Sequence, residues 1–276
     1  MYSHYFFGAS LFLHMTNVVL LALLFLGILM VLVALVLKPR KKARIFIPLP
    51  DAFKKILHEN VAFYRHLDEN GKTNFENRVQ HFLSATRITG IRTKVEDIDR
   101  VLIGASAIIP IYAFDGWEYV NLKEVLLYPE TFGENFQTEG GDRVVMGMVG
   151  SGAMQQVMIL SQHALRQGFS NKTDKNNTAI HEFVHLVDKT DGDVDGVPEV
   201  LLANRYVLPW LDMVHKNIKD IIRDRSDINP YGATSQAEFL AVAAEYFFER
   251  PDLLKMKHPE LYAMLEIIFG KKNSTE

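Results

Sequence analysis

The sequence of 276 residues contains no cysteine. This absence excludes disulfide bonds, zinc sites with thiolate ligands and catalysis by a thiol nucleophile. It also fits a reducing compartment, in which proteins fold without disulfides. The net charge of −3 provides no strongly basic surface, so we expect no nucleic-acid partner. The length allows one medium-sized or two small domains with a substantial core.

Charged residues are missing from the start of the chain, since none of the first 37 residues is Asp, Glu, Lys or Arg. Within this stretch, residues 18–37 are an unbroken apolar run of twenty residues, long enough to cross a hydrocarbon core of about 30 Å as one helix. A cleaved secretory signal is the alternative, but it would have a basic start, a shorter apolar core and a small-residue cleavage site. The sequence therefore favours an uncleaved transmembrane helix.

Positive charge follows the apolar run, with five Lys and Arg residues in 38–44 and none before the run. By the positive-inside rule, the C-terminal side of the span then lies in the cytoplasm, and the basic cluster can bind anionic lipid headgroups. We therefore expect a single-pass protein of the inner cell membrane. Its parts would be a membrane anchor (1–44), a body that faces the cytoplasm (45–270) and a polar tail (271–276).

The rest of the sequence predicts an α+β fold, mainly helical with a small sheet. Apolar periodicity and helix-capping residues predict helices at 51–66, 74–86, 95–109, 178–189, 197–206, 210–224, 235–250 and 259–268. Apolar and β-branched runs predict an extended segment at 88–93 and strands at 125–128, 144–149 and 156–160. The glycine-rich residues 133–155 match neither a P-loop nor a dinucleotide-binding loop, so we expect a flexible hairpin or flap there.

The motif His181-Glu182-Phe-Val-His185 carries the clearest chemical signal. Apolar residues interleave with it and indicate a helix with one buried side: Ile180, Phe183, Val184 and Val187. Histidines four apart lie on one helix face and can bind one metal ion. The adjacent glutamate can accept a proton from a water molecule whose pKa zinc lowers. Two surface histidines beside a salt-bridging glutamate are the alternative, but unpaired polar groups on a buried helix would be costly.

Two histidines need a third protein ligand to form an open catalytic zinc site. Asp191 is excluded, because the turn that would deliver it requires glycine where the chain has Asp188. Glu238 and Glu245 are seven residues apart and share one face of a predicted helix. A capping box with Ser235 would also explain Glu238, whereas Glu245 lies among apolar residues, where a bare carboxylate is costly. From the residues alone, at least one of these two glutamates serves the site.

Residues 191–196 match the first half of a calcium-binding EF-hand loop. Position twelve of that loop would be Leu202 instead of the bidentate glutamate. Calcium is therefore not expected.

Several spaced motifs resemble the Mlc titration factor A family. They span about residues 50–270 and include His181 to Asp188, Asp191 to Pro198, Tyr231 to Phe239 and Ala244 to Phe248. The resemblance implies a zinc-dependent peptidase of the gluzincin type, with a zincin-like catalytic domain similar to that of anthrax lethal factor. It also implies aminopeptidase-like activity on short or flexible peptides.

The same resemblance implies roles for individual residues. The ligands of Zn²⁺ would be His181, His185 and Glu238. Glu182 would act as the general base, and Tyr231 would stabilise the tetrahedral oxyanion.

Two further carboxylates, Asp188 and Glu245, then lie behind the implied ligands. Such carboxylates often accept a hydrogen bond from the spare imidazole N–H of a zinc-bound histidine. For Asp188, an ordinary polar residue at the end of a helix is the alternative.

The substrate would be held by a strand. In metallopeptidases, the strand just before the metal helix presents its free edge to the substrate backbone. The order of the segments gives this place to residues 156–160, which would take up the peptide as an additional strand.

The leading hypothesis is thus a membrane-tethered zinc metallopeptidase that cleaves a peptide or protein substrate. The alternative is a regulatory binding protein whose zinc site is structural or vestigial. A protease embedded in the membrane would need several spans, and the sequence shows one. The founding member of the family is soluble and binds the transcriptional repressor Mlc, so the resemblance also implies a regulatory protein partner.

Overall fold

The computed structural model of the chain describes residues 24–30, 33, 47–130, 147–149, 156–171, 174–198 and 201–270. The chain divides into two compact units, residues 1–46 and 47–276. In the first unit, residues 24–30 are helical. None of the helices within the described residues combines the length and the apolar character that a membrane span requires. Most of the predicted span, the basic cluster at 38–44 and the polar tail lie outside the described residues.

The second unit begins with helices α2 (Asp51–Asn60), α3 (Ala62–Arg65), α4 (Glu69–Ala85) and α5 (Asp97–Ile108) and the short 3-10 helix η1 (Ile109–Ile111). The predicted helix 51–66 is interrupted at Val61, whose backbone is extended with φ −103° and ψ 102°. Helix α4 begins earlier than predicted, because the Asp68 side chain accepts a hydrogen bond from Gly71 N at 2.7 Å and so caps its first turn.

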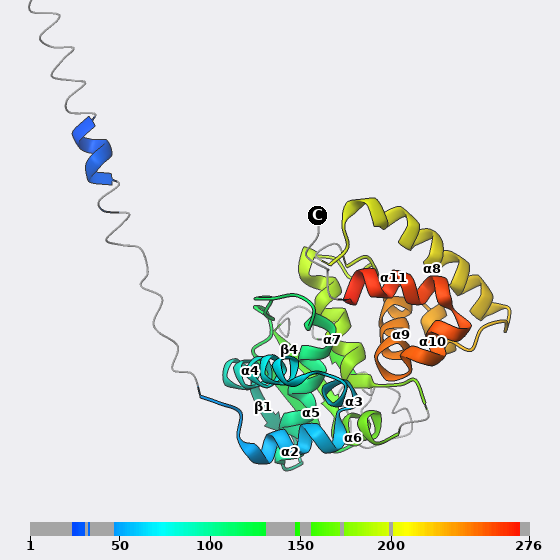
Figure 1. The fold of residues 1–276 in the computed structure, drawn as a ribbon, viewed down its shortest axis with the longest axis horizontal. Helices are drawn as coiled ribbons and strands as arrows, with labels where there is room; N and C mark the ends of the chain where they lie inside the picture. Colours follow the sequence, from blue (N-terminus) through cyan, green and yellow to red (C-terminus); the bar gives the residue numbers. More distant parts are fainter. Residues whose placement is uncertain are drawn as a thin grey trace, which may run out of the picture. The chain divides into compact units, whose positions relative to one another are not determined.

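The same unit contains a four-stranded sheet with the strand order β1-β2-β4-β3, and Figure 1 labels β1 and β4. Its strands are β1 (Arg87–Gly90), β2 (Glu124–Tyr128), β3 (Gly147–Val149) and β4 (Val157–Ser161). Strands β1, β2 and β4 are parallel, and their register aligns Ile88 with Val125 and Val125 with Met158. These three side chains are buried in the core. The α+β class predicted from the sequence is therefore confirmed.

The prediction that the strand at residues 156–160 has a free edge is wrong. Strand β4 pairs with β2 on one side and with β3, antiparallel, on the other. The chain after β2 returns to the sheet before β4 and supplies β3. Among the described strands, β3 therefore lies at this edge, while residues 144–146 of the predicted strand lie outside the described part of the chain.

The C-terminal half is helical: α6 (Gln162–Ser170), α7 (Thr178–Asp188), η3 (Lys189–Asp191), η4 (Asn204–Tyr206), α8 (Val207–Ile222), η5 (Pro230–Ala233), α9 (Gln236–Glu249), α10 (Pro251–Lys257) and α11 (Pro259–Phe269). Helix α6 was not predicted, although Ser161 caps it by accepting a hydrogen bond from Ala164 N at 3.1 Å. Residues 199–200 of the helix predicted at 197–206 lie outside the described part of the chain, and among the other residues of that range the structure shows the 3-10 turn η4. Helix α8 begins at Val207 and not, as predicted, after Pro209. Proline is tolerated in the first turn of a helix, because the N–H groups of that turn have no acceptor within the helix.

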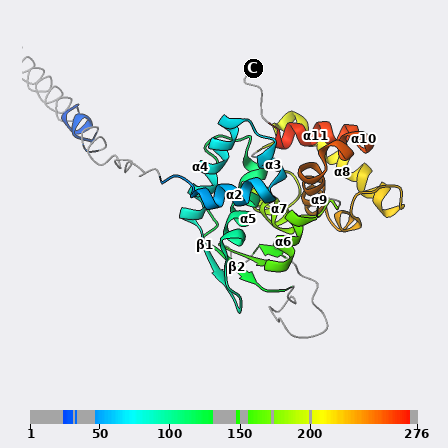
Figure 2. The same cartoon turned by 60° about the horizontal axis from the view of Figure 1, so that its bottom comes forward.

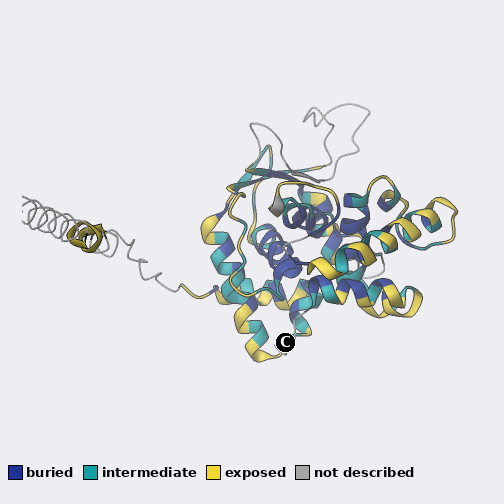
Figure 3. Ribbon diagram, turned by 90° about the horizontal axis from the view of Figure 1, so that it is seen from above, coloured by how far each residue is buried: buried dark blue, intermediate teal, exposed yellow. Residues whose placement is uncertain are grey.

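Helix α7 occupies the centre of this unit. It contacts α5, α6, β3 and β4 on one side and α9 on the other. Figure 2 shows the sheet and helices α8, α10 and α11 on opposite sides of α7. Buried residues concentrate on the central helices, and exposed residues lie on the outer faces (Figure 3). The helix that carries the motif is thus part of the core.

The loop between α8 and η5 is fixed by the Asp227 carboxylate. This carboxylate accepts hydrogen bonds from Lys175 Nζ at 3.1 Å, Tyr246 Oη at 2.9 Å, Lys257 Nζ at 2.9 Å and His258 Nε2 at 2.7 Å. Burial opposes its ionisation, but these donors outweigh burial and hold the pKa of Asp227 well below its usual range. One carboxylate therefore links the segment before α7, helix α9 and the α10–α11 connection.

We expect Asp227→Asn to lower the free energy of unfolding by about 2 kcal/mol at pH 7, because charged hydrogen bonds to four donors are lost. A lowered pKa in the folded state gives stability that is present above the unfolded pKa of about 3.9 and is lost as the pH falls below it. Urea unfolding measures the difference in the free energy of unfolding between wild type and Asp227→Asn. We expect this difference to be smaller at about pH 3.5, just below the unfolded pKa, than at neutral pH. Asp212→Asn, at an exposed position of α8, is the control. A loss that is equal at both pH values would contradict the assignment.

Candidate metal centre

The two motif histidines lie on one face of α7, which begins at a strong cap. Asn177 accepts a hydrogen bond from Ile180 N through its side-chain Oδ1 at 3.2 Å. His181 and Glu182 are only 8% and 7% exposed. Two ionisable residues are therefore held in the interior, where they need partners.

Three candidate donor atoms converge on one point. His181 Nε2 lies 3.0 Å from His185 Nε2 and 2.9 Å from Glu238 Oε2, and His185 Nε2 lies 3.4 Å from the same carboxylate oxygen. Donor atoms around a tetrahedral zinc ion, with bonds of about 2.0–2.1 Å, lie about 3.3 Å apart. The spacing of the three atoms fits an ion of this size.

Glu238 comes from the first turn of α9. Its backbone N donates to Ser235 Oγ at 3.1 Å, so Ser235 caps the helix. The Glu238 carboxylate is directed to the two histidine rings. The sequence left open whether the Glu238 side chain completes a capping box with Ser235 or serves the metal site. In the structure this side chain contacts the two histidines.

The electrostatics of the cluster favour a bound cation. Burial lowers the pKa of His181, but the Glu238 and Glu245 carboxylates outweigh burial and raise it to about 10. Burial likewise opposes ionisation of Glu238, yet the two histidines lower its pKa to about 2. The carboxylates thus attract positive charge to the ring nitrogens. Two imidazoles and one carboxylate are also a donor set that catalytic zinc sites use, so these residues fit a zinc ion.

Glu245 holds His181 from behind. Its Oε1 lies 2.7 Å from His181 Nδ1, and its other oxygen accepts a hydrogen bond from the backbone N of Asn177. A proton on Nδ1 that is donated to Glu245 leaves the Nε2 lone pair free for a metal. His185 Nδ1 is buried and makes no hydrogen bond to any residue that the structure describes.

Asp188 lies on the same helix and holds a neighbouring loop. Its Oδ2 accepts a hydrogen bond from Gly196 N at 2.9 Å, and the carbonyl of Gly196 accepts one from Trp210 Nε1 at 2.6 Å. Gly196 has φ +80°, and a Cβ there would lie 2.4 Å from the carbonyl oxygen of Gln236. The loop therefore packs directly on the start of α9, two residues before Glu238. A bond from Asp188 to a ligand histidine stays a prediction.

Glu182 and Tyr231 border the three donor atoms. Burial raises the pKa of Glu182 against the opposing effect of the two histidines. Tyr231 lies in η5, is 53% exposed, and has its ring centroid 6.0 Å from that of His181. Partial burial and the charges of Glu238 and Glu182 raise the pKa of its phenol, which therefore keeps its proton as a donor.

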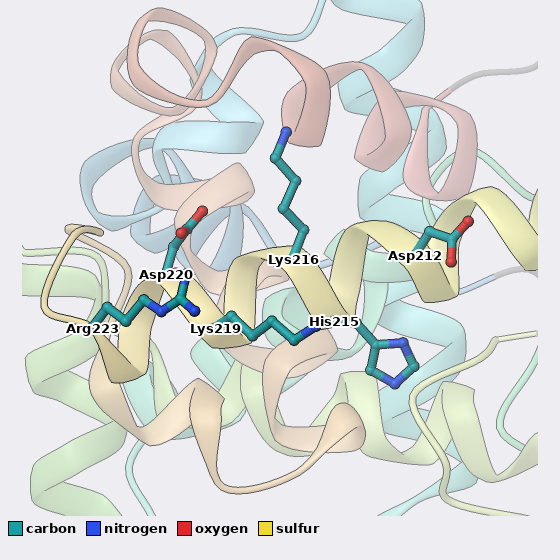
Figure 4. A pocket seen from close by; sticks show the side chains of 6 residues that line it. All are labelled: Asp212, His215, Lys216, Lys219, Asp220 and Arg223. Carbon is teal, nitrogen blue, oxygen red and sulfur yellow. The ribbon is translucent and has the colours of Figure 1, made fainter.

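A hollow of about 590 Å³ lies elsewhere, along α8 (Figure 4). Its lining is charged and consists of Asp212, His215, Lys216, Lys219, Asp220 and Arg223. None of these residues belongs to the donor cluster, although His215 Nε2 lies 3.0 Å from the Gln236 side chain at the start of α9.

Sequence reasoning missed three residues that build the site. Asn177, Gly196 and Asp227 act through contacts with residues far away in the chain, which for Gly196 is its packing against Gln236. Of the three, only Asn177 has a local signal, because asparagine just before an apolar helix is a preferred cap.

Comparison with known proteins confirms the family resemblance. Residues 37–270 match the family described as glucose-regulated metallo-peptidase M90. An uncharacterized protein of Synechocystis sp. is 29% identical over 231 residues, which are 79% of this chain and 83% of that protein. Mlc titration factor A of Pectobacterium atrosepticum is 32% identical over 164 residues, 55% of this chain and 58% of that protein. The protein of the same name from Cronobacter sakazakii is 28% identical over 208 residues, 70% of this chain and 76% of that protein.

The packing of Gly196 on α9 predicts unequal effects for two alanine substitutions. Gly192→Ala introduces a residue at φ +115° with nothing within 4 Å of its Cβ, so only backbone strain of about 1–2 kcal/mol is expected. Gly196→Ala adds a collision with the backbone of Gln236 and Ala237, for a total loss of about 3–4 kcal/mol. Chemical unfolding measures the free energy of unfolding of both variants, and competition with a chelator measures their zinc affinity. Weakened zinc binding is expected for Gly196→Ala alone, and equal behaviour of the pair would refute the role of this contact.

Proposed function

The chain belongs to the glucose-regulated metallo-peptidase M90 family, and from this premise we propose that it is a zinc-dependent peptidase. The observation that carries the proposal is the meeting of His181, His185 and Glu238 beside Glu182. The proposed reaction is hydrolysis of peptide bonds in short or flexible peptides. An aminopeptidase-like preference is part of the proposal and rests on the family resemblance.

The residues divide the proposed reaction between them. A zinc ion held by the two imidazoles and the Glu238 carboxylate would polarise the scissile carbonyl and lower the pKa of a water molecule. Glu182 accepts the proton of the attacking water and delivers it to the leaving amine nitrogen; a raised pKa suits a group that must both take and give a proton. The Tyr231 hydroxyl donates a hydrogen bond to the oxygen on which negative charge develops.

Strand β3 is the proposed docking edge for the substrate. It lies at the edge of the described sheet and contacts α7. An extended peptide that pairs with β3 would run alongside the helix that carries Glu182. This replaces β4, whose two sides are paired.

A regulatory binding protein is the second candidate. The relatives from Pectobacterium and Cronobacter carry the name Mlc titration factor A, which points to a protein partner for those relatives. A corresponding partner for this chain, with a metal ion that only supports the fold, would explain the same three ligands. Retention of Glu182 beside them favours the peptidase.

The peptidase proposal is tested by Glu182→Gln in the full chain. We expect one zinc ion per chain in both proteins and a loss of kcat of about 10³-fold or more in the variant, because the proton acceptor is removed while the ligands remain. Hydrolysis of short peptides and metal analysis are the measurements. Glu260→Gln, which changes an exposed ion pair with Lys216 on α8, is the control. A Glu182→Gln variant that binds zinc and cleaves at the wild-type rate would favour the binding-protein alternative.

We also propose that residues 18–37 anchor the chain in the cell membrane with the catalytic unit in the cytoplasm. The apolar run and the basic residues after it support this proposal. The full chain should remain with the membrane fraction after washes with high salt and carbonate, and a chain that starts at residue 45 should not. Release of the full chain by high salt alone would reject the span in favour of binding through the basic cluster.

A further inference from the structure

Helix α9 directs three carboxylates at α7. Glu238, Glu245 and Glu249 are separated by seven and four residues, which places them on one helix face. The first two contact the His181 ring. The third, at the last residue of α9, lies away from the histidines and has no part in the chemistry described above.

Glu249 holds Asn177, the cap of α7. The Asn177 side chain donates to Glu249 Oε1 through Nδ2 at 2.8 Å and accepts from Ile180 N through Oδ1 at 3.2 Å. Its backbone N donates to Glu245, and its backbone carbonyl accepts from His181 N at 3.0 Å. One fully buried residue thus joins the first turn of the metal helix to two carboxylates of α9.

These contacts require an amide at position 177. The cap needs an acceptor and Glu249 needs a donor, and asparagine supplies both from one short side chain. The orientation of the amide is fixed by the two partners, since the opposite assignment would oppose donor to donor and acceptor to acceptor. Helix α6 closes a third side, where a Cβ on Gly168 would lie 3.0 Å from Asn177 Cγ. Asn177 therefore has little room to adopt another position.

We propose that Asn177 and Glu249 are a pair of positioning residues that fix α7 on α9 and thereby set His181 against Glu245 for metal binding. Neither residue touches the metal donor atoms. Asn177 acts on His181 by two routes, directly through the first backbone bond of the helix and indirectly through Glu245. The inference rests on the proposed zinc centre, and it assigns part of the metal affinity to a contact one layer further from the ion.

The test reverses the polarity of the pair. Asn177→Asp keeps the cap acceptor but places a carboxylate against Glu249 and Glu245, so we expect a loss of zinc affinity of about 30–100-fold. Adding Glu249→Gln supplies an amide that donates to the new carboxylate, and the double variant should return to within about 5-fold of wild type. Glu249→Gln alone retains an acceptor for Asn177 and should lose little. Asn217→Asp on α8 is the matched control, because the Asn217 side chain donates only to Met213 O among the described contacts.

Zinc affinity is measured on the full chain by chelator competition, and the visible spectrum of the Co²⁺-loaded protein reports ligand geometry. A positioning role predicts that the Co²⁺ spectrum changes in Asn177→Asp and is restored in the double variant. Additive losses, or a folded Asn177→Asp with wild-type affinity, would overturn the proposal.

Two outcomes separate this inference from the proposed peptidase activity. If Asn177→Asp fails to fold, Asn177→Ser keeps a cap without the bond to Glu249 and must itself lose about 10-fold in zinc affinity. If the wild-type protein binds zinc but cleaves no peptide, the proposed peptidase activity is wrong, while the positioning role of Asn177 and Glu249 still stands. Wild-type protein that binds no zinc would sink both.

Discussion

The packing of α7 on α9 is the constraint on which the rest of this structure depends. His181 is caught between two carboxylates of α9, with Glu238 at one ring nitrogen and Glu245 at the other. Each carboxylate would be costly to bury alone, and each is satisfied by the same ring. The contact is therefore polar at its centre, and each helix also packs into the apolar core, where Phe183 contacts Phe82 and Tyr119 and Phe239 contacts Trp210. Such an interface has one register, because any slip leaves charges without partners.

The surrounding elements maintain this register from both ends of the helix pair. At the start of α7, Asn177 joins the helix to Glu245 and Glu249. At its end, Asp188 holds the loop at Gly196 against the start of α9. The Asp227 carboxylate fixes the loop that leads to Tyr231. Three hydrogen-bonded contacts of modest individual strength thus restrain the geometry of one small cluster.

The sequence predicts the centre of the site better than its surroundings. The spacing of His181 and His185 follows from helix geometry, and the seven-residue interval between Glu238 and Glu245 places both on one face. The structure brings these side chains together. Physical reasoning could not choose between the two glutamates, because the choice depends on how far α9 extends along α7, and this is a property of packing. The hydrogen bond from Gly196 N to Asp188 spans only 8 residues, but it depends on the path of the loop between them.

Some features of the fold cannot be predicted from local sequence patterns. Strand β4 was recognised, but its pairing with β3 depends on the path of the chain after β2, which no apolar periodicity encodes. Residues 197–206 are apolar enough for a helix, yet Gly196 and Val197 are held in the loop by Asp188 and Asp195, and the described residues of this segment form the 3-10 turn η4 at its end. Tertiary hydrogen bonds outweigh helix propensity there. Ser235, recognised as a capping residue in the sequence, in contrast marks the start of α9 correctly.

The candidate donor atoms come from two distant segments of the chain, and this has a consequence during synthesis of the protein. The motif helix ends at Asp188, whereas the carboxylate that completes the cluster follows some fifty residues later, beyond all of α8. A ribosome-bound chain that has just released α7 holds two imidazoles and no third ligand, and it also lacks the carboxylates that orient the ring of His181. The three candidate donor atoms can therefore meet only after Glu238 has been synthesised, and a shorter product that retains the whole motif lacks the third of them.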